Sequence, residues 1–144
     1  MKLYLDNSFL NRPFDDPAVS DNKIEADVLF VILRAVKAKK VALINSALIE
    51  YENNKNTQRH RQIFVKRVLS FATYFQPVTP VIRTRALCIE QEFSIDALDA
   101  LHVASAEAAK ANNFITCDHS IIKRYTDDKI MIHGPISFIN TWKQ

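Results

Sequence analysis

Glycine is almost absent from this chain, with Gly134 as its only occurrence in 144 residues. Phosphate-binding loops and dinucleotide-binding motifs need several glycines, because their backbone must approach a phosphate closely. The sequence therefore excludes both kinds of nucleotide site. Cysteine is scarce too: Cys88 and Cys117 have no neighbouring cysteine or histidine at the spacing of a zinc site. We expect both to be reduced, buried structural residues.

Long apolar runs are also missing. No segment approaches the roughly 20 apolar residues that a membrane span needs, and the first residues follow a strand pattern rather than that of a secretion signal. With 48% hydrophobic and 24% charged residues, the chain is not disordered. Its length predicts a single domain over residues 1–144, which we expect in the cytoplasm without membrane contact. The net charge of +3 permits nucleic-acid binding without requiring it.

Short apolar runs alternate with helical patterns along the chain. Runs that are apolar at nearly every position predict strands at 2–5, 41–44, 114–117 and 129–133. Apolar residues at helical spacing predict helices at about 20–40, 57–73, 80–92, 94–112 and 119–124, and another that starts near Ser46 and carries Glu50. Strands that are apolar on both faces and separated by helices are typical of a parallel sheet covered on both sides. The fold class is therefore α/β with a mostly parallel central sheet.

Four acidic residues, Asp6, Glu50, Asp99 and Asp118, each lie just after an apolar run or early in the following helix. The carboxyl ends of the strands in such a sheet open into one crevice, so these side chains are expected to converge. Asp99 carries most weight, because its neighbours in the sequence are largely apolar and solvent cannot easily compensate its charge.

Each acid also has an ordinary explanation. Asp6 suits a turn, Asp118 suits a helix N-cap, and Asp96 with Asp99 has the spacing of a capping box. Glu50 could be a solvated helix residue, and Glu52, two positions on, competes with it for a place in the crevice. Whether Asp96 or Glu52 joins the site stays open at this point.

Convergence of four carboxylates would have a large energetic cost. Two unit charges ~4 Å apart repel by about 4 kcal/mol at an effective dielectric constant of ~20. A hard divalent cation removes this cost, and a ligand set made of oxygen atoms alone favours magnesium or manganese over zinc. Such an ion activates water and stabilises charge on a phosphodiester, which points to nuclease chemistry.

The same segments resemble the PIN-domain family, in particular the VapC-like ribonuclease toxins of toxin-antitoxin pairs. The resemblance is carried by Leu5-Asp6-Asn7-Ser8, Glu50-Tyr51, the run from Asp99 to Ala106, and Ile115-Thr116-Cys117-Asp118. It implies a three-layer α/β/α sandwich, RNA as the substrate, a cognate antitoxin as partner, and a metal held by the four acids above. It also implies supporting roles for Asn7, Ser8 and Thr116, and an auxiliary role for Asp96 if that residue is more than a helix cap.

Three basic residues are candidates for RNA contact. Arg12 either contacts a phosphate or is a surface arginine next to Pro13, while Lys123 and Arg124 are the basic residues best placed near Asp118.

His102 either serves as a ligand or base, or packs beside the sheet with its ring hydrogen-bonded. The aromatic residues at apolar-periodic positions are expected mostly in the core: Tyr4, Tyr51, Phe71, Tyr74, Phe75 and Trp142. The helix after Ser20 offers apolar positions for a homodimer.

Two other functions compete with a metal-dependent endoribonuclease. A catalytically silent PIN-like module would hold RNA or a protein without cutting, and it is distinguished by a failure to bind manganese. A phosphoryl-accepting domain also uses an aspartate at a strand end. Ser8 stands where a dehalogenase-type motif needs a second aspartate, and no lysine of the receiver type follows the last predicted strand. The sequence thus disfavours the phosphoryl-accepting class.

Overall fold

A five-stranded parallel sheet forms the centre of the computed structural model, which describes residues 1–142. The strands are β1 (Lys2–Leu5), β2 (Ala42–Ser46), β3 (Tyr74–Gln76), β4 (Asn113–Ile115) and β5 (Met131–His133), arranged in the order β3-β2-β1-β4-β5. In register, Leu3 pairs with Leu43 of β2, and Tyr4 pairs with Phe114 of β4. The predicted α/β class with a parallel sheet is confirmed.

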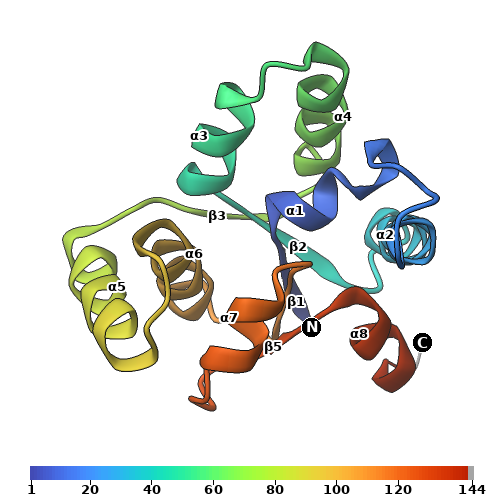
Figure 1. Ribbon diagram of the computed structural model, residues 1–144. Coiled ribbons are helices and arrows are strands. Elements are labelled where there is room, and N and C mark those ends of the chain that lie inside the picture. Colours follow the sequence, from blue (N-terminus) through green and yellow to red (C-terminus); the bar gives the residue numbers. More distant parts are fainter. Residues whose placement is uncertain (143–144) are drawn as a thin grey trace.

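Helices cover both faces of this sheet (Figure 1). They are α1 (Asn7–Leu10), the 3-10 helix η1 (Arg12–Phe14), α2 (Asn22–Lys37), α3 (Ala47–Lys55), α4 (Arg59–Leu69), α5 (Pro80–Phe93), α6 (Ala97–Ala108), α7 (His119–Arg124) and α8 (Pro135–Thr141). Helices α2 and α8 pack together on one side, and α5 and α6 pack together on the other. The three-layer α/β/α arrangement is therefore also confirmed.

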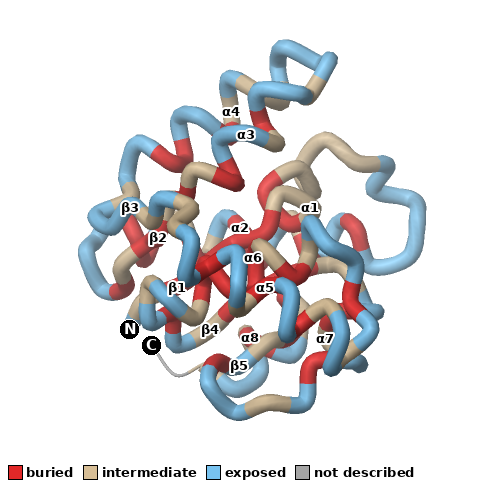
Figure 2. The backbone as a smooth tube through the Cα atoms, turned by 90° about the vertical axis from the view of Figure 1, so that its left-hand side faces the viewer, coloured by how far each residue is buried: buried red, intermediate tan, exposed pale blue. Residues whose placement is uncertain are grey.

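The core lies on both faces of the central strands, where burial is most complete (Figure 2). Tyr4 of β1 is fully buried and its ring stacks on Phe114 of β4, with centroids 5.1 Å apart. This burial on both faces explains why the first strand is apolar at consecutive positions instead of alternating. The strand that positions the site is therefore rigidly packed.

Side-chain caps fix where several helices begin. Ser46 Oγ accepts a hydrogen bond from Ile49 N at 3.0 Å and starts α3, and Thr79 Oγ1 accepts one from Ile82 N at 3.2 Å and starts α5. Serine and threonine are among the residue types that favour the N-cap position. Asp118 caps α7 in the same way, through a 2.9 Å bond from Ser120 N.

Strand β3 was not predicted. The helix expected over residues 57–73 ends at Leu69, and the chain then adds a three-residue edge strand beside β2. Phe75, which the sequence predicts in the core, is 55% exposed. A short edge strand with one solvated face carries no periodic apolar signal, which is why the pattern failed here. Helix α8 was also missed.

Several expected core positions lie at the surface. Of the aromatic residues assigned mostly to the core, four are exposed: Tyr51, Phe71, Tyr74 and Phe75. Cys88 is exposed as well, whereas Cys117 is partly buried, and both are free thiols. Helical spacing cannot tell a face that meets the sheet from one that meets solvent. Within the described residues, no helix has the length and apolar character to cross a membrane.

Candidate metal centre

The order of the strands places a crevice between β1 and β4. From β1 the chain proceeds to β2 and β3 on one side, and later to β4 and β5 on the other side. This reversal leaves an opening at the carboxyl ends of β1 and β4, where ligands bind in open α/β sheets. Asp6 directly follows β1, and its backbone N–H donates to the Ile115 carbonyl of β4 at 3.0 Å.

Asp6 is held by hydroxyl groups from both sides of the crevice. Its side chain is buried, with 7% exposure. Ser8 Oγ donates to Asp6 Oδ2 at 2.9 Å and Thr116 Oγ1 donates to the same oxygen at 2.7 Å. Thr116 Oγ1 in turn accepts the backbone N–H of Asp118 at 3.0 Å. The hydroxyls orient Asp6 without neutralising its charge.

Asp99 lies in the first turn of α6 and faces the same charges. Burial, followed by the nearby charges of Asp118 and Asp6, raises the pKa of Asp99 to about 6. Carboxylates from three different elements are therefore close enough to repel one another. Across residues 1–142, no ion pair joins any of the three to a lysine or arginine.

Glu50 is not brought into this crevice, which corrects the sequence-based choice. Its side chain is exposed and lines a hollow between α3 and α4, together with Lys66 and Ser70. Glu52 takes the expected place: its carboxylate accepts hydrogen bonds from His102 and from Asn7 Nδ2, the latter at 3.2 Å. Residues two apart on a helix point about 200° apart, so only one of them can face the sheet edge.

His102 of α6 connects Glu52 to the core. The ring is buried with 1% exposure, its Nε2 contacts Glu52, and its Nδ1 is 2.7 Å from the hydroxyl of Tyr4. One oxygen of Asp6, one of Glu52 and one ring nitrogen of His102 all lie within 4.8 Å of one another. Burial alone would raise the pKa of Glu52, but its hydrogen bond with His102 and the charge of that ring outweigh burial and lower it.

Asp96 occupies the N-cap position of α6, yet its side chain accepts no capping hydrogen bond. It is exposed, and its charge raises the pKa of Asp99 less than the charges of Asp118 and Asp6 do. Asn7 lies closer to the site, because it donates to Glu52 and to the Ile49 carbonyl. The auxiliary positions Asn7, Ser8 and Thr116 thus contact the acids directly, whereas Asp96 stands at the rim.

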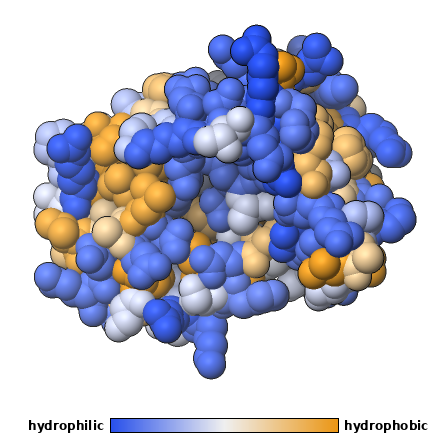
Figure 3. All heavy atoms as spheres, turned by 45° about the horizontal axis from the view of Figure 1, so that its top comes forward, coloured by the Kyte–Doolittle hydropathy of each residue, from blue (hydrophilic) through white to orange (hydrophobic). Residues whose placement is uncertain are grey.

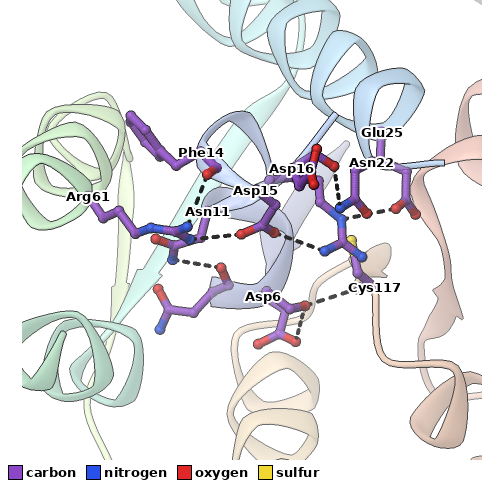
Figure 4. Close-up of polar contacts among 12 residues, drawn as sticks. Asp6, Asn11, Phe14, Asp15, Asp16, Asn22, Glu25, Arg61 and Cys117 are labelled. Atoms are coloured by element: carbon purple, nitrogen blue, oxygen red, sulfur yellow. Dashed lines mark hydrogen bonds and ion pairs between the residues drawn. The ribbon is translucent and has the colours of Figure 1, made fainter. Parts of the chain in front are cut away.

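The basic residues proposed for RNA contact have different surroundings. Arg12 forms ion pairs with Asp15 at 2.9 Å and Glu25 at 3.0 Å, so its charge is already matched. Arg61 of α4 adds a second arginine to Asp15, and Figure 4 shows Asp6 and Cys117 lying beside this network. Arg124 donates to the Ser94 carbonyl at 2.6 Å. Lys123 is exposed.

The surface around this end of the molecule is mainly polar. Figure 3 brings the top of Figure 1 forward and shows hydrophilic side chains around a central hollow, with apolar groups gathered toward the sides. One apolar groove lies between α2 and α4, and its lining includes the apolar residues Phe30, Leu33, Phe64 and Phe71 together with the basic residues Arg34, Lys37 and Arg67.

A parallel sheet with crowded carboxylates at its switch point, which no lysine or arginine pairs with in residues 1–142, defines a class of α/β proteins whose site suits a hard divalent cation. The PIN domain family model matches residues 3–127, so the chain belongs to the PIN domain family. No curated protein sequence shows significant similarity to it.

Two solved structures show the same fold. VapBC2 from Rickettsia felis, bound to a DNA fragment from its promoter, is similar with a TM-score of 0.61 and 14% identity over 93% of this chain and 98% of that one. FitAB bound to an IR36 DNA fragment is similar with a TM-score of 0.59 and 16% identity over 92% and 94%. At such low identity the likeness concerns the fold alone.

Proposed function

We propose that this chain is a metal-dependent endoribonuclease in which Asp6, Glu52, Asp99 and Asp118 hold a magnesium or manganese ion. One observation carries the proposal: acids from separate elements crowd the switch point, and no lysine or arginine pairs with Asp6, Asp99 or Asp118 within the described residues. PIN domains are generally nucleases, which supports the reaction class. We propose RNA as the substrate because the sequence resembles the toxin ribonucleases of this family.

The donor atoms fit such an ion. Carboxylate and amide oxygens are the ligands that magnesium and manganese prefer. Two side-chain oxygens in the described part of the chain are free to bind the ion. Within residues 1–142, neither Asp6 Oδ1 nor the buried Asn7 Oδ1 has a hydrogen-bond partner. A bound ion of this kind lowers the pKa of a water molecule and stabilises charge on the phosphodiester that it attacks.

The side chains around the acids have supporting roles. Ser8 and Thr116 hold Asp6 Oδ2 and leave Oδ1 for a ligand. Asn7 restrains Glu52 by donating to its carboxylate. Lys123 follows Asp118 within one short helix and remains exposed, so it is the basic residue best placed to meet a phosphate. Arg12 is less suited, because binding a phosphate would break two ion pairs.

RNA cleavage by the purified chain tests the proposal. We expect manganese to support cleavage, EDTA to stop it, and Asp6→Asn to abolish it while the circular dichroism spectrum stays unchanged. Asp27→Asn is the matched control, since Asp27 is an exposed residue of α2. Full cleavage by Asp6→Asn, or cleavage that EDTA does not reduce, contradicts the proposal. A wild-type chain that neither cuts RNA nor binds manganese in calorimetry would instead be a silent binding module.

We further propose a protein partner of the antitoxin kind. VapBC2 and FitAB support this, because both are assemblies bound to DNA. The groove between α2 and α4 is the surface that suits it: Phe30 is 45% exposed and Phe71 is 42% exposed, and three basic residues border them. This combination fits a segment with apolar and acidic side chains.

Co-expression with the product of the neighbouring reading frame tests the partner. We expect the two chains to purify together, and Phe30→Glu to separate them without unfolding this chain. The expected homodimer stays a prediction, and α2 also exposes Ile24, with 54% exposure. If Phe30→Glu instead converts a dimer of this chain to a monomer in sedimentation analysis, the groove serves self-association and the partner proposal fails.

A further inference from the structure

A line of hydrogen bonds runs from the core to Glu52 and joins three elements that supply the metal centre. Ile49 N donates to Ser46 Oγ at 3.0 Å, Ser46 Oγ lies 2.8 Å from the Tyr4 hydroxyl, and that hydroxyl lies 2.7 Å from His102 Nδ1. His102 Nε2 completes the line at Glu52 Oε1. We call this set of residues the Tyr4–His102 line.

Every member of the line except Glu52 is buried. Tyr4 and Ser46 are fully buried, and His102 has 1% exposure. Tyr4 lies two residues before Asp6 on β1, and Ser46 caps the helix that carries Glu52. His102 is one helical turn after Asp99 on α6. The line therefore links the backbone positions of three acids of the centre.

The chemistry of the contact decides which atom of His102 carries hydrogen. An ionised carboxylate only accepts hydrogen bonds, so Nε2 must donate to Glu52. This holds whether the ring is neutral, with the Tyr4 hydroxyl donating to Nδ1, or cationic, with Nδ1 donating to that hydroxyl. A nitrogen that carries hydrogen has no lone pair for a metal.

Resting on the proposed function, we infer that His102 is a positioning residue: it donates from Nε2 to Glu52 Oε1 and leaves Glu52 Oε2 for the cation, so its ring is not a ligand. Tyr4 holds the other side of the ring and keeps Nε2 aimed at the carboxylate. The closeness of the His102 ring to Glu52 follows from this hydrogen bond. Partners that orient metal ligands in this way commonly affect metal affinity by 10–100-fold.

Manganese binding distinguishes this role from direct ligation. Pulsed electron paramagnetic resonance of the manganese-loaded wild type should show no coupling to a directly bound ¹⁴N nucleus. In calorimetry, His102→Leu should weaken manganese binding by about 10–100-fold. His102→Gln should restore most of the affinity, because its amide nitrogen can donate near the position of Nε2. A purely space-filling role would predict the opposite order, since leucine fills an apolar site better than glutamine.

Tyr4→Phe tests the same inference if His102→Leu does not fold. It removes only the hydroxyl that contacts His102 and retains the ring stacked on Phe114. It should weaken manganese binding severalfold, whereas the control Tyr74→Phe at the surface should not. A strong ¹⁴N coupling, or wild-type affinity in both His102→Leu and Tyr4→Phe, overturns the inference and leaves the proposed function intact. A wild-type chain that binds no manganese overturns the proposed function itself.

Discussion

Two groups of buried or partly buried acidic residues in this protein differ in what balances their charges. Between α5 and α6, Arg85 donates to both carboxylate oxygens of Glu107, at 2.8 and 3.0 Å, and to Asp127 at 3.0 Å. At the switch point, Asp6, Asp99 and Asp118 have no such partner in residues 1–142. An arginine therefore compensates the acids between α5 and α6, whereas none among the described residues compensates the acids at the switch point.

The energetic consequence also differs. The two acids beside Arg85 are compensated, and the Tyr125 hydroxyl adds another donor to Glu107 at 2.6 Å. In the crevice, burial and then the nearby charges of Asp118 and Asp6 raise the pKa of Asp99, so within residues 1–142 these acids are not compensated. Functional sites commonly retain such unfavourable arrangements. The comparison therefore predicts opposite responses to substitution and to added cations.

Removal of Arg85 should have the largest effect on stability. Arg85→Ala leaves the side chain of Glu107, only 8% exposed, as a nearly buried charge without its main partner. We expect the free energy of unfolding to fall by about 3 kcal/mol. Urea denaturation measures this, and Arg83→Ala, at an exposed position of the same helix, is the control. A loss below about 0.5 kcal/mol would remove the contrast between the two groups.

Added manganese should stabilise the folded protein by binding to the acids of the crevice, and not to those beside Arg85. At a concentration of about 100 times its dissociation constant, an ion bound to the folded state adds about 2.7 kcal/mol. We expect a matching rise in the unfolding temperature of the wild type, reversed by EDTA, and a much smaller rise for Asp6→Asn. Differential scanning fluorimetry measures the shift. Equal shifts in both proteins would place the ion elsewhere.

Substitution of Asp99 should change how stability depends on pH. Because folding raises the pKa of Asp99 to about 6 from 3.8, the folded state holds its proton more tightly. This contribution is present below pH 3.8 and is lost as pH rises through 6. After allowance for partial solvent screening, we expect the free energy of unfolding of metal-free Asp99→Asn to be about 1 kcal/mol higher than that of the wild type at pH 7.5. Urea titrations at pH 4 and 7.5 test this, and a constant difference contradicts it.

Glu50 and Glu52 provide the smallest and most selective test. Glu50→Gln alters an exposed residue and should change both stability and manganese affinity by less than about 0.5 kcal/mol. Glu52→Gln should weaken manganese binding clearly, because it alters a carboxylate held by His102 and Asn7. Calorimetry on the two variants compares neighbours on one helix. The reverse result would restore Glu50 to the site.

Most of the fold followed from local patterns. Strands β1, β2 and β4 are apolar at consecutive positions because both of their faces are covered. Ser46 and Thr79 are residue types that favour N-caps, and they mark where α3 and α5 begin. Strand β3 did not follow from such a pattern. Its three residues are held by backbone pairing with β2, and backbone pairing leaves little trace in side chains.

Parts of the candidate site were less accessible to sequence reasoning. The direction of a side chain on α3 depends on where that helix meets α1 and α6, so Glu52 could not be preferred over Glu50 beforehand. The sequence left Arg12 either as a phosphate contact or as a surface arginine, because its partner Glu25 lies 13 residues away. His102 was expected either as a ligand or base, or packed with its ring hydrogen-bonded; its partner Glu52, 50 residues away, could not be identified from the sequence.

The sequence by itself determined that Asp6 and Asp118 would lie at one end of a parallel sheet, because each comes shortly after a strand that could be recognised from its apolar residues. Only the tertiary structure decided which glutamate enters the crevice, which arginine is already paired, and that a buried tyrosine holds the histidine beside it. These outcomes depend on the rotation of helices against the sheet, which arises from packing between residues far apart in the chain.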